Sequence, residues 1–178
     1  MARFVALLRG VNVGSHNRIA MADVRAAVSA AGYTDVATLV QSGNVVLSAS
    51  GSAASVGSAV EAALRKRMDL DIDVIVRTSG EMSKIATTHP FGAPRVEGKF
   101  LHVAFLKQKP AAAAARALAA TDFGTDRFEV RGTELYLHYA QGQGRSKMTT
   151  AFFERALAVP MTVRNWNVVT KLAEMVRR

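Results

Sequence analysis

Residues 76–85 read VRTSGEMSKI, and residues 163–172 read VRNWNVVTKL. Both stretches begin with Val-Arg, carry a Ser/Thr-Lys pair near the end and finish on Ile or Leu, at an offset of 87 residues. In each of them an apolar strand is predicted to run into an amphipathic helix. A pattern that returns in this way indicates that one structural unit occurs twice in the chain.

Two further pairs of segments support the duplication. VALL at 5–8 matches VAFL at 103–106 at an offset of 98, and VQSGNVVLS at 40–48 matches VRGTELYLH at 130–138 at an offset of 90. The hairpin-like middle segment is flanked by turn residues in both copies. Because the offset falls from 98 to 90, the first copy carries about eight residues that the second lacks.

The order of predicted elements is the same in both halves. Periodicity and capping signals predict strand, helix, strand, strand, helix, strand and a further helix. The ranges are 3–9, 21–31, 36–41, 44–49, 53–68, 72–77 and 79–87, then 100–107, 110–120, 126–131, 134–139, 146–158, 160–164 and 166–176.

This order predicts an α+β fold of two tandem ferredoxin-like (βαββαβ) units. Each unit is expected to be an antiparallel four-stranded sheet with helices, plus an extra helix after it. A stretch rich in Pro and Gly separates the halves. We therefore predict a first unit at 1–88, a linker at 89–99 and a second unit at 100–178.

Composition narrows the classes of protein to which the chain can belong. It has 178 residues, 49% of them hydrophobic, so it is predicted to be globular with a buried core. It has no cysteine, which excludes disulfides, thiolate metal sites and cysteine nucleophiles. No apolar run reaches the roughly 18 residues of a membrane span. We expect a cytoplasmic protein with no membrane partner.

The net charge of +9 favours an anionic partner, although drift of the composition toward Arg would also produce it. The histidines are scattered without metal-ligand spacing, so we expect neither a metal nor a cofactor. They are His16, His89, His102 and His138.

The extra residues of the first copy lie mostly in RGVNVGSHNR, at 9–18. The corresponding turn of the second copy is only KQKP, so folding alone does not require the longer loop. All five asparagines of the chain fall in three segments, 9–20, 41–44 and 164–171, which contain no Asp or Glu. Turns and helix caps also favour Asn. We favour a ligand site, because a side-chain amide is both donor and acceptor.

A fourth polar segment, QGQGRSK at 141–147, is predicted to open the helix at 146–158. A helix N-terminus attracts anions, and Arg145 and Lys147 would add positive charge. The alternative is ordinary capping by Ser146 with solvated basic neighbours.

The leading interpretation is a protein that binds, and could act on, a small phosphate- or carboxylate-bearing ligand. No nucleophile can be assigned, and whether the chain is an enzyme stays open. The predicted ligand-binding residues are Arg9, Asn12, Asn17, Gln41, Ser42, Asn44, Arg145, Ser146, Lys147, Arg164, Asn165, Trp166 and Asn167.

Two other functions compete with this interpretation. The predicted topology is also that of an RNA-recognition motif, which stacks bases on aromatic rings of its sheet. The middle strand at 44–49 has no aromatic ring, and the one at 134–139 has Tyr136 and His138 on one face. RNA is therefore the less favoured partner. The polar loops could instead meet another protein or a second copy. The oligomeric state is left open.

Four motifs together resemble a known bacterial family. RGVNVG (9–14), QSGNVV (41–46), GRSK (144–147) and RNWNVVTKL (164–172) are similar, in this order, to the uncharacterised proteins known as domain of unknown function 1697. The resemblance implies a small soluble bacterial protein built from ferredoxin-like units. It implies no activity and no catalytic residues.

Overall fold

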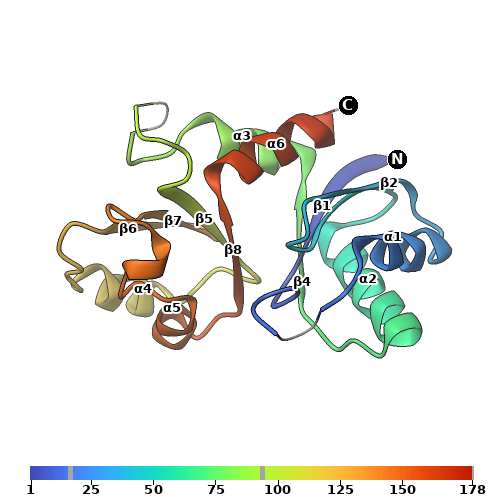
Figure 1. The fold of residues 1–178 in the computed structure, drawn as a ribbon, viewed down its shortest axis with the longest axis horizontal. Helices are drawn as coiled ribbons and strands as arrows, with labels where there is room; N and C mark the ends of the chain where they lie inside the picture. Colours follow the sequence, from blue (N-terminus) through green and yellow to red (C-terminus); the bar gives the residue numbers. More distant parts are fainter. Residues whose placement is uncertain (16–17, 93–94, 178) are drawn as a thin grey trace. The chain divides into compact units, whose positions relative to one another are not determined.

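The fold, taken from a computed structural model, is described for residues 1–15, 18–92 and 95–177 (Figure 1). The first half forms a four-stranded antiparallel sheet in the order β2-β3-β1-β4. Its elements are β1 (Ala2–Leu8), α1 (Met21–Ala30), β2 (Thr34–Leu39), β3 (Asn44–Ala49), α2 (Ala53–Met68), β4 (Val74–Thr78) and α3 (Ser79–Thr87).

The second half repeats this plan with a sheet in the order β6-β7-β5-β8, again antiparallel. The predicted α+β fold of two ferredoxin-like patterns is therefore confirmed. The elements are β5 (Leu101–Leu106), α4 (Ala112–Ala119), β6 (Arg127–Arg131), β7 (Glu134–His138), the 3₁₀ turn η1 (Gln143–Arg145), α5 (Thr150–Leu157), β8 (Met161–Asn165) and α6 (Trp166–Arg177).

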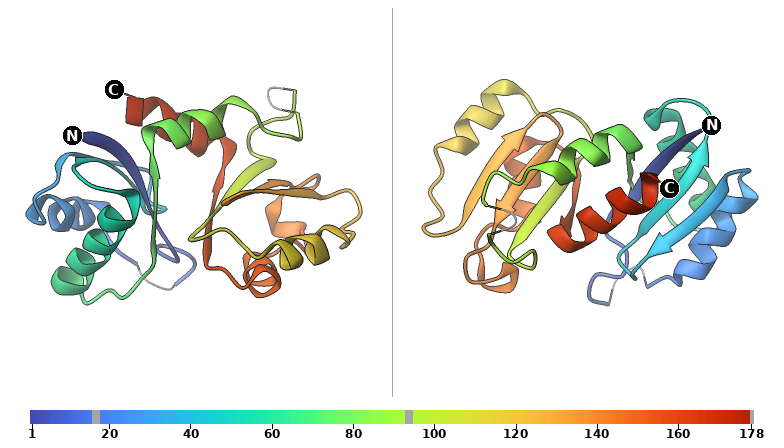
Figure 2. Two further views of the ribbon diagram at one scale, coloured as in Figure 1. Left: turned by 180° about the vertical axis from the view of Figure 1, so that it is seen from behind. Right: turned by 90° about the horizontal axis from the view of Figure 1, so that it is seen from above.

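The first hydrophobic core lies between the sheet and helices α1 and α2. Phe4, Ala6 and Leu8 of β1 face this side, because alternate residues of a strand share a face. Val24 of α1 and Val60 of α2 pack in the same core and are fully buried. Figure 2 shows the two helices side by side on one face of the sheet. The loop that joins β1 to α1 thus starts from a rigid base.

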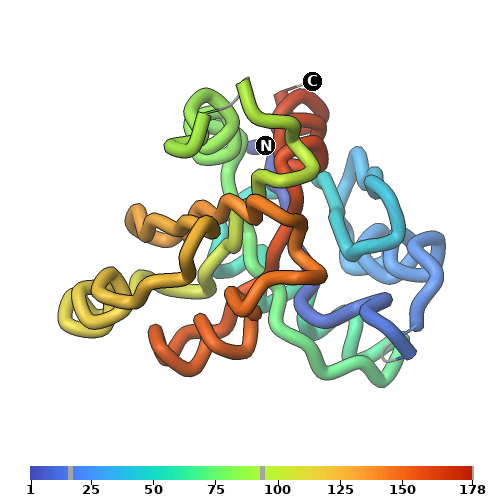
Figure 3. The backbone as a smooth tube through the Cα atoms, turned by 60° about the vertical axis from the view of Figure 1, so that its left-hand side comes forward, coloured from blue at the N-terminus to red at the C-terminus, as the bar shows by residue number. Residues whose placement is uncertain are grey.

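The second core is built in the same way, from β5, β7 and β8 under α4 and α5. Ala104 and Leu106 of β5 face Leu118 of α4 and Phe153 of α5. The two helices lie next to each other on one face of the sheet, as the backbone trace shows (Figure 3). Four phenylalanine rings pack edge to face in this core and on its border, which favours a fixed arrangement.

The chain divides into two compact units, each described separately below. Met1–Ala86 and the segment from Lys171 onward form the first, and Thr87–Thr170 form the second. The sequence assigned the whole C-terminal helix to the second unit, at 100–178. The end of α6 groups with the first unit instead, where the guanidinium of Arg3 in β1 donates to the backbone carbonyl of Met175 at 3.1 Å.

Several helix starts agree with their sequence signals. Glu81 accepts from the backbone N–H of Thr78, and the Thr78 hydroxyl accepts from the Glu81 N–H, which is the capping box that the pattern Thr-x-x-Glu at 78–81 predicts. Ser52 caps α2 and forms a reciprocal box with Ser55.

The predicted helix at 146–158 is wrong at its beginning. The helix α5 starts at Thr150, and Thr149 caps it by accepting from the N–H of Phe152. Ser146 instead follows the short turn η1. The two glycines just before Arg145, in QGQG at 141–144, favour turn geometry over a regular helix, because glycine is costly inside a helix.

Within the described residues, no helix is long and apolar enough to cross a lipid bilayer. The cytoplasmic location expected from the sequence stays a prediction.

Candidate functional site

Asn12 holds the long loop of the first unit in place. Its backbone is left-handed, with a φ of 54°, which Asn tolerates better than most residues. The side-chain amide donates to the carbonyl oxygens of Ile19 (3.0 Å) and Gln41 (2.6 Å), and its oxygen accepts from the N–H of Ile19 (2.8 Å). One side chain therefore joins both ends of the loop to the neighbouring hairpin.

The hairpin between β2 and β3 packs closely against the start of the same loop. Gly43 has a φ of 76°, and a Cβ there would lie 2.5 Å from Val11 Cγ2 and 2.8 Å from Leu8 Cβ. Its carbonyl also accepts from the N–H of Leu8 at 2.8 Å. Only glycine allows this approach of the hairpin to the end of β1.

Asn44 lies inside this hairpin and is fully buried. Its amide donates to the carbonyl of Leu39 (3.0 Å) and to the hydroxyl of Ser42 (2.9 Å). The predicted strand at 44–49 has the same bounds as β3, so Asn44 is its first residue. What the sequence did not predict is that the Asn44 amide is buried and stabilises the turn.

A pocket of about 450 Å³ opens between the loop and the beginning of α1. It is lined by Asn12, Gly14, Arg18, Ile19, Ala20 and Gln41. Arg18 and Gln41 are exposed, so their side chains are open to a ligand. Arg18 was not among the predicted binding residues, although it belongs to the stretch that suggested the site.

The sequence segments that form this site contain no Asp or Glu, but an acidic residue from another strand lies close to it in space. A carboxylate oxygen of Asp73 lies 3.9 Å from the guanidinium of Arg9, and the backbones of the two residues also bond at 3.0 Å. Leu8 pairs with Val74, because β4 begins where β1 ends. This topology could have identified Asp73, since the first and last strands of the unit are antiparallel neighbours.

In the second unit, Ser146 is used to fasten a loop. Its hydroxyl donates to Asp126 (2.6 Å) and accepts from the N–H of Met148 (3.0 Å). Asp126 also accepts from the N–H of Ala140 (2.8 Å). Sequence reasoning missed Asp126, whose carboxylate holds the loop after β7. Arg145 and Lys147 are exposed on either side of Ser146, and no helix begins there.

Arg164 is a buried strand residue and not a loop residue. Its guanidinium donates to the hydroxyl of Thr162 (2.7 Å) and to the carbonyl of Val163 (2.8 Å). Burial lowers the pKa of Arg164 to about 10. Arg77, its counterpart in the repeat, is also buried and donates to the carbonyl of Val76. The repeated Val-Arg pair therefore places a buried arginine at the corresponding position of each sheet.

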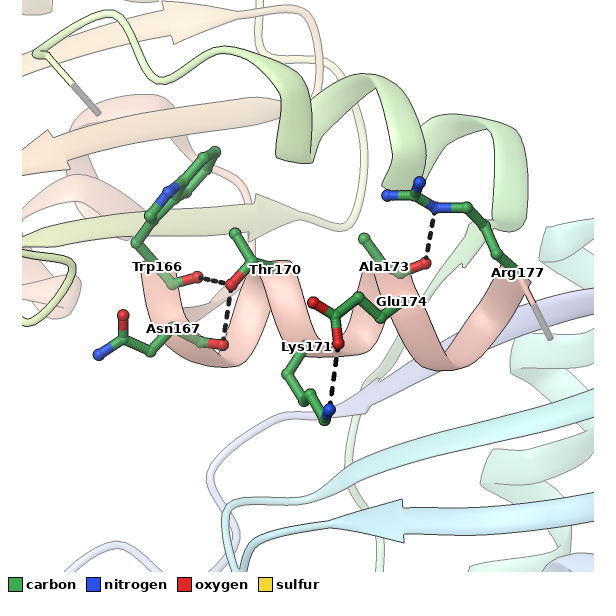
Figure 4. Close-up of polar contacts among 7 residues, drawn as sticks. All are labelled: Trp166, Asn167, Thr170, Lys171, Ala173, Glu174 and Arg177. Carbon is green, nitrogen blue, oxygen red and sulfur yellow. Dashed lines mark hydrogen bonds and ion pairs between the residues drawn. The ribbon is translucent and has the colours of Figure 1, made fainter. Parts of the chain in front are cut away.

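The residues that follow Arg164 start α6. Asn165 accepts from the N–H of Val168 (3.0 Å), as an N-cap does. Asn167 is exposed, and a Cβ at Gly98 would lie 2.1 Å from its side-chain oxygen. Figure 4 shows Trp166 and Asn167 at the helix start, with the hydroxyl of Thr170 bonded back to both of their carbonyls.

Trp166 packs in a cluster of rings that the sequence did not predict. The ring of His89 lies edge-on to Trp166 at 5.0 Å and to Tyr136 at 5.3 Å. His89 Nε2 is 3.1 Å from the carbonyl of His102, and Nδ1 accepts from the N–H of Phe91. Burial lowers the pKa of His89 to about 4, so the neutral ring that donates from Nε2 is the stable form.

The structure thus brings Arg9, Asn12, Gln41, Ser42 and Asn44 together in the first unit, at one end of its sheet. Asn17 and His16 lie outside the described residues. In the part of the chain that the structure describes, no group of three or more acidic or histidine side chains could hold a metal ion.

Residues 1–136 match the family described as "Protein of unknown function (DUF1697)". The chain belongs to the DUF1697 family. A search of curated proteins gives no match. The structure is similar to the solved structure of conserved bacterial protein SP0830 from Streptococcus pneumoniae, with a TM-score of 0.76 and 19% sequence identity. The alignment covers 100% of this chain and 99% of that one, and at this identity it shows the fold alone.

The match to DUF1697 contains the pocket in front of α1 and the hairpin beside it. It ends before the loop with Ser146 and before β8 and α6. The family assignment therefore rests on the first unit and on the beginning of the second.

Proposed function

We propose that this chain binds a small phosphate- or carboxylate-bearing ligand in the pocket in front of α1. The observation that carries the proposal is the position of this pocket at a helix start. Ala20 is the N-cap residue and its methyl group cannot cap the first amides. The first N–H groups of any α-helix have no acceptor within the helix, so those of Met21 and Ala22 lack one here, and the positive end of the helix dipole lies beside them.

Arg18 supplies the cation of the proposed site. It is exposed and lines the pocket. The negative charge of Asp23, in the first turn of α1, partly cancels the positive potential at the helix start. Arg18 is therefore the group that would make the site attractive to an anion. A guanidinium can bind a carboxylate or phosphate through two parallel hydrogen bonds.

Asn12 has a positioning role in this proposal. Its amide already bonds Ile19 and Gln41, and this holds the pocket walls in one arrangement before a ligand arrives. A preformed site loses less conformational entropy on binding. The side chain of Gln41 is exposed and offers an amide for reading the ligand.

The predicted contacts in the second unit stay predictions. Arg145, Lys147 and Asn167 are exposed and open to a ligand. Positioning and electrostatic stabilisation are the roles that these side chains can fill.

RNA binding through a sheet face has less support. An RNA-recognition motif stacks bases on exposed aromatic rings of its sheet. Tyr136 on β7 is only 6% exposed, and the ring of His89 lies against it. In the second unit, the ring of His89 therefore covers a tyrosine on which a base would need to stack.

The test is a thermal-shift series with sulfate, inorganic phosphate and nucleotides at millimolar concentration. A ligand that binds only the native state at about a hundred times its Kd stabilises by about 2.7 kcal/mol. Arg18→Ala should lose roughly 1.5–3 kcal/mol of this binding energy, or about tenfold or more in affinity. Arg67→Ala, which removes the same charge from an exposed position on α2, should bind like the parent protein.

Two results would contradict the proposal. One is no stabilisation by any of these anions beyond that seen with chloride. The other is equal stabilisation of Arg18→Ala and the parent. A short single-stranded RNA, titrated at two salt concentrations, is the comparison ligand. Tight RNA binding with a steep salt dependence, unaffected by Arg18→Ala, would favour the RNA alternative.

A further inference from the structure

Among the residues that the structure describes, strand β6 of the second sheet has a neighbouring strand on one side only. The sheet order β6-β7-β5-β8 places it at an edge (Figure 1). Its sequence, Arg127–Arg131, alternates charged and apolar side chains. Strand β2, an edge of the first sheet, has a register shift between Thr34 and Ala37, a device that blunts edges. Strand β6 instead keeps a regular register along its whole length.

The hydrogen bonds of the sheet show which backbone groups of β7 are used by β5. The N–H of Tyr139 donates to the carbonyl of Phe100, and the N–H of Leu106 donates to the carbonyl of Thr133, both at 2.9 Å. Odd-numbered residues from 133 to 139 therefore bond toward β5. Successive residues of a strand direct their backbone groups to opposite sides, so the even-numbered residues of β7 bond toward β6.

The same alternation decides which groups of β6 are left at the open edge. Glu134 is paired with Arg131, and Tyr136 is paired with Glu129. The odd-numbered residues of β6 thus use their N–H and C=O groups inside the sheet. Phe128 and Val130 direct theirs to the open side, where another strand could bond them.

A groove of about 540 Å³ follows this edge. Part of its lining is apolar, from Ala115 and Ala119 of α4, Phe123, and the side chains of Phe128 and Val130 themselves. An added strand would bond the backbone of β6 and place its apolar side chains in this groove.

We propose that β6 pairs antiparallel with β6 of a second copy of this chain across a two-fold axis. The charges of the strand are complementary to themselves in this arrangement. With Phe128 on the axis, Arg127 of each copy lies opposite Glu129 of the other. With Val130 on the axis, Glu129 of each copy lies opposite Arg131 of the other. Opposite charges on facing residues stabilise an antiparallel pair.

The symmetric register centred on Glu129 is disfavoured by the same charges. With Glu129 on the axis, the two Glu129 side chains face each other and Arg127 faces Arg131. Like charges directly opposite destabilise a strand pair. Glu129 and Arg131 are 42% and 48% exposed and form an ion pair within one chain, so both charges are accessible at the edge.

A charge exchange tests the proposal. Variant one is Glu129→Arg, which makes the charged face of β6 wholly basic. Variant two is Arg127→Glu with Arg131→Glu, which makes it wholly acidic. Sedimentation equilibrium of the full chain should show a concentration-dependent dimer for the parent, at least tenfold weaker dimerisation for each variant alone, and a dimer again for their equimolar mixture.

A backbone variant provides a check that does not depend on charge. Val130→Pro removes an outward N–H that the monomer's ladder does not use, so the sheet should stay intact while dimerisation weakens. Val130→Ala is its control for lost packing and should dimerise more strongly than Val130→Pro. Circular dichroism verifies the folding of each variant. If a charge variant is unfolded, the comparison of Val130→Pro with Val130→Ala tests whether β6 forms the dimer contact.

Three outcomes would overturn the proposal. They are a parent protein that stays monomeric at about millimolar concentration, charge variants that dimerise like the parent, and a mixture of the two variants that stays monomeric. A parent dimer that is insensitive to all of these changes would place the contact on another surface. Parent monomers that bind an added extended peptide at β6 would show that the edge accepts a different partner.

Discussion

The side-chain amide of Asn12 lies 2.6 Å from the backbone carbonyl of Gln41, a residue 29 positions further along the chain. Together with its two hydrogen bonds to Ile19, this contact makes Asn12 the residue that holds the long loop in place. The Asn12 amide bonds the protein's own backbone. Asn12 would therefore affect ligand binding through the shape of the pocket.

Replacing Asn12 by Asp should destabilise the protein although the size of the side chain is unchanged. A carboxylate has no donor for the carbonyls of Ile19 and Gln41 and would place an acceptor against both. We expect a loss of roughly 1–3 kcal/mol in the free energy of unfolding, measured by urea denaturation at pH 7. The exposed Asn167→Asp is the control. An unchanged urea midpoint for Asn12→Asp would contradict the role of Asn12 in holding the loop.

Two glycines with positive φ should differ in their response to alanine. Gly10 has a φ of 69° and no atom within 4 Å of an added Cβ, whereas at Gly43 the Cβ would lie 2.5 Å from Val11 Cγ2. Gly10→Ala should cost about 1–2 kcal/mol from backbone strain alone. Gly43→Ala should cost roughly 1–3 kcal/mol more, because of overpacking. Equal losses in denaturation midpoint would show that the hairpin can move away from Val11.

Acid should destabilise the fold through His89 and His102. Burial is the main cause that lowers the pKa of both side chains from 6.5 to about 4, against the opposing effect of their backbone hydrogen bonds. Between pH 6.5 and 4 the unfolded chain therefore binds more protons than the folded one. The stabilisation is complete above pH 6.5 and is lost as the pH falls toward 4, on the order of 3 kcal/mol for each side chain.

Denaturation midpoints at pH 7, 6 and 5 measure this effect. His89→Phe keeps an aromatic ring but cannot bind a proton, so it should flatten the dependence on pH even if it lowers stability at pH 7. His138 and Arg131 are the charged or titratable neighbours that also lower the pKa of His89. If His89→Phe kept the full dependence between pH 6.5 and 5, another group would be responsible for it.

Local patterns predicted most of the fold. The apolar run of β1 and the capping box at Thr78 and Glu81 depend on residues close in the chain, and both are found in the structure. The prediction of a helix at 146–158 was wrong at its start because a residue distant in the chain intervenes. Ser146 has the signature of a cap, but its hydroxyl donates to Asp126, 20 residues earlier, and α5 starts at Thr150.

The candidate site was predicted less completely. The convergence of the loop and the hairpin follows from the βαββαβ order, because both leave the same end of the sheet. The neighbourhood of Arg9 and Asp73 follows from that order too, once the start of β4 is placed beside the end of β1. The burial of Asn44 could not be inferred, because an asparagine in a hairpin turn and one buried beside it have the same sequence signature.

By itself, the sequence determined that this protein is one βαββαβ pattern used twice, since periodicity, caps and repeats are properties of neighbouring residues. Only the tertiary structure decided which polar groups are already occupied. Asn12 and Asn44 give their amides to the backbone, and Arg164 gives its guanidinium to the hydroxyl of Thr162 and the carbonyl of Val163, whereas Arg18 is exposed at a pocket. The reason is physical: a buried polar group must find a partner, and that partner is chosen by proximity in space.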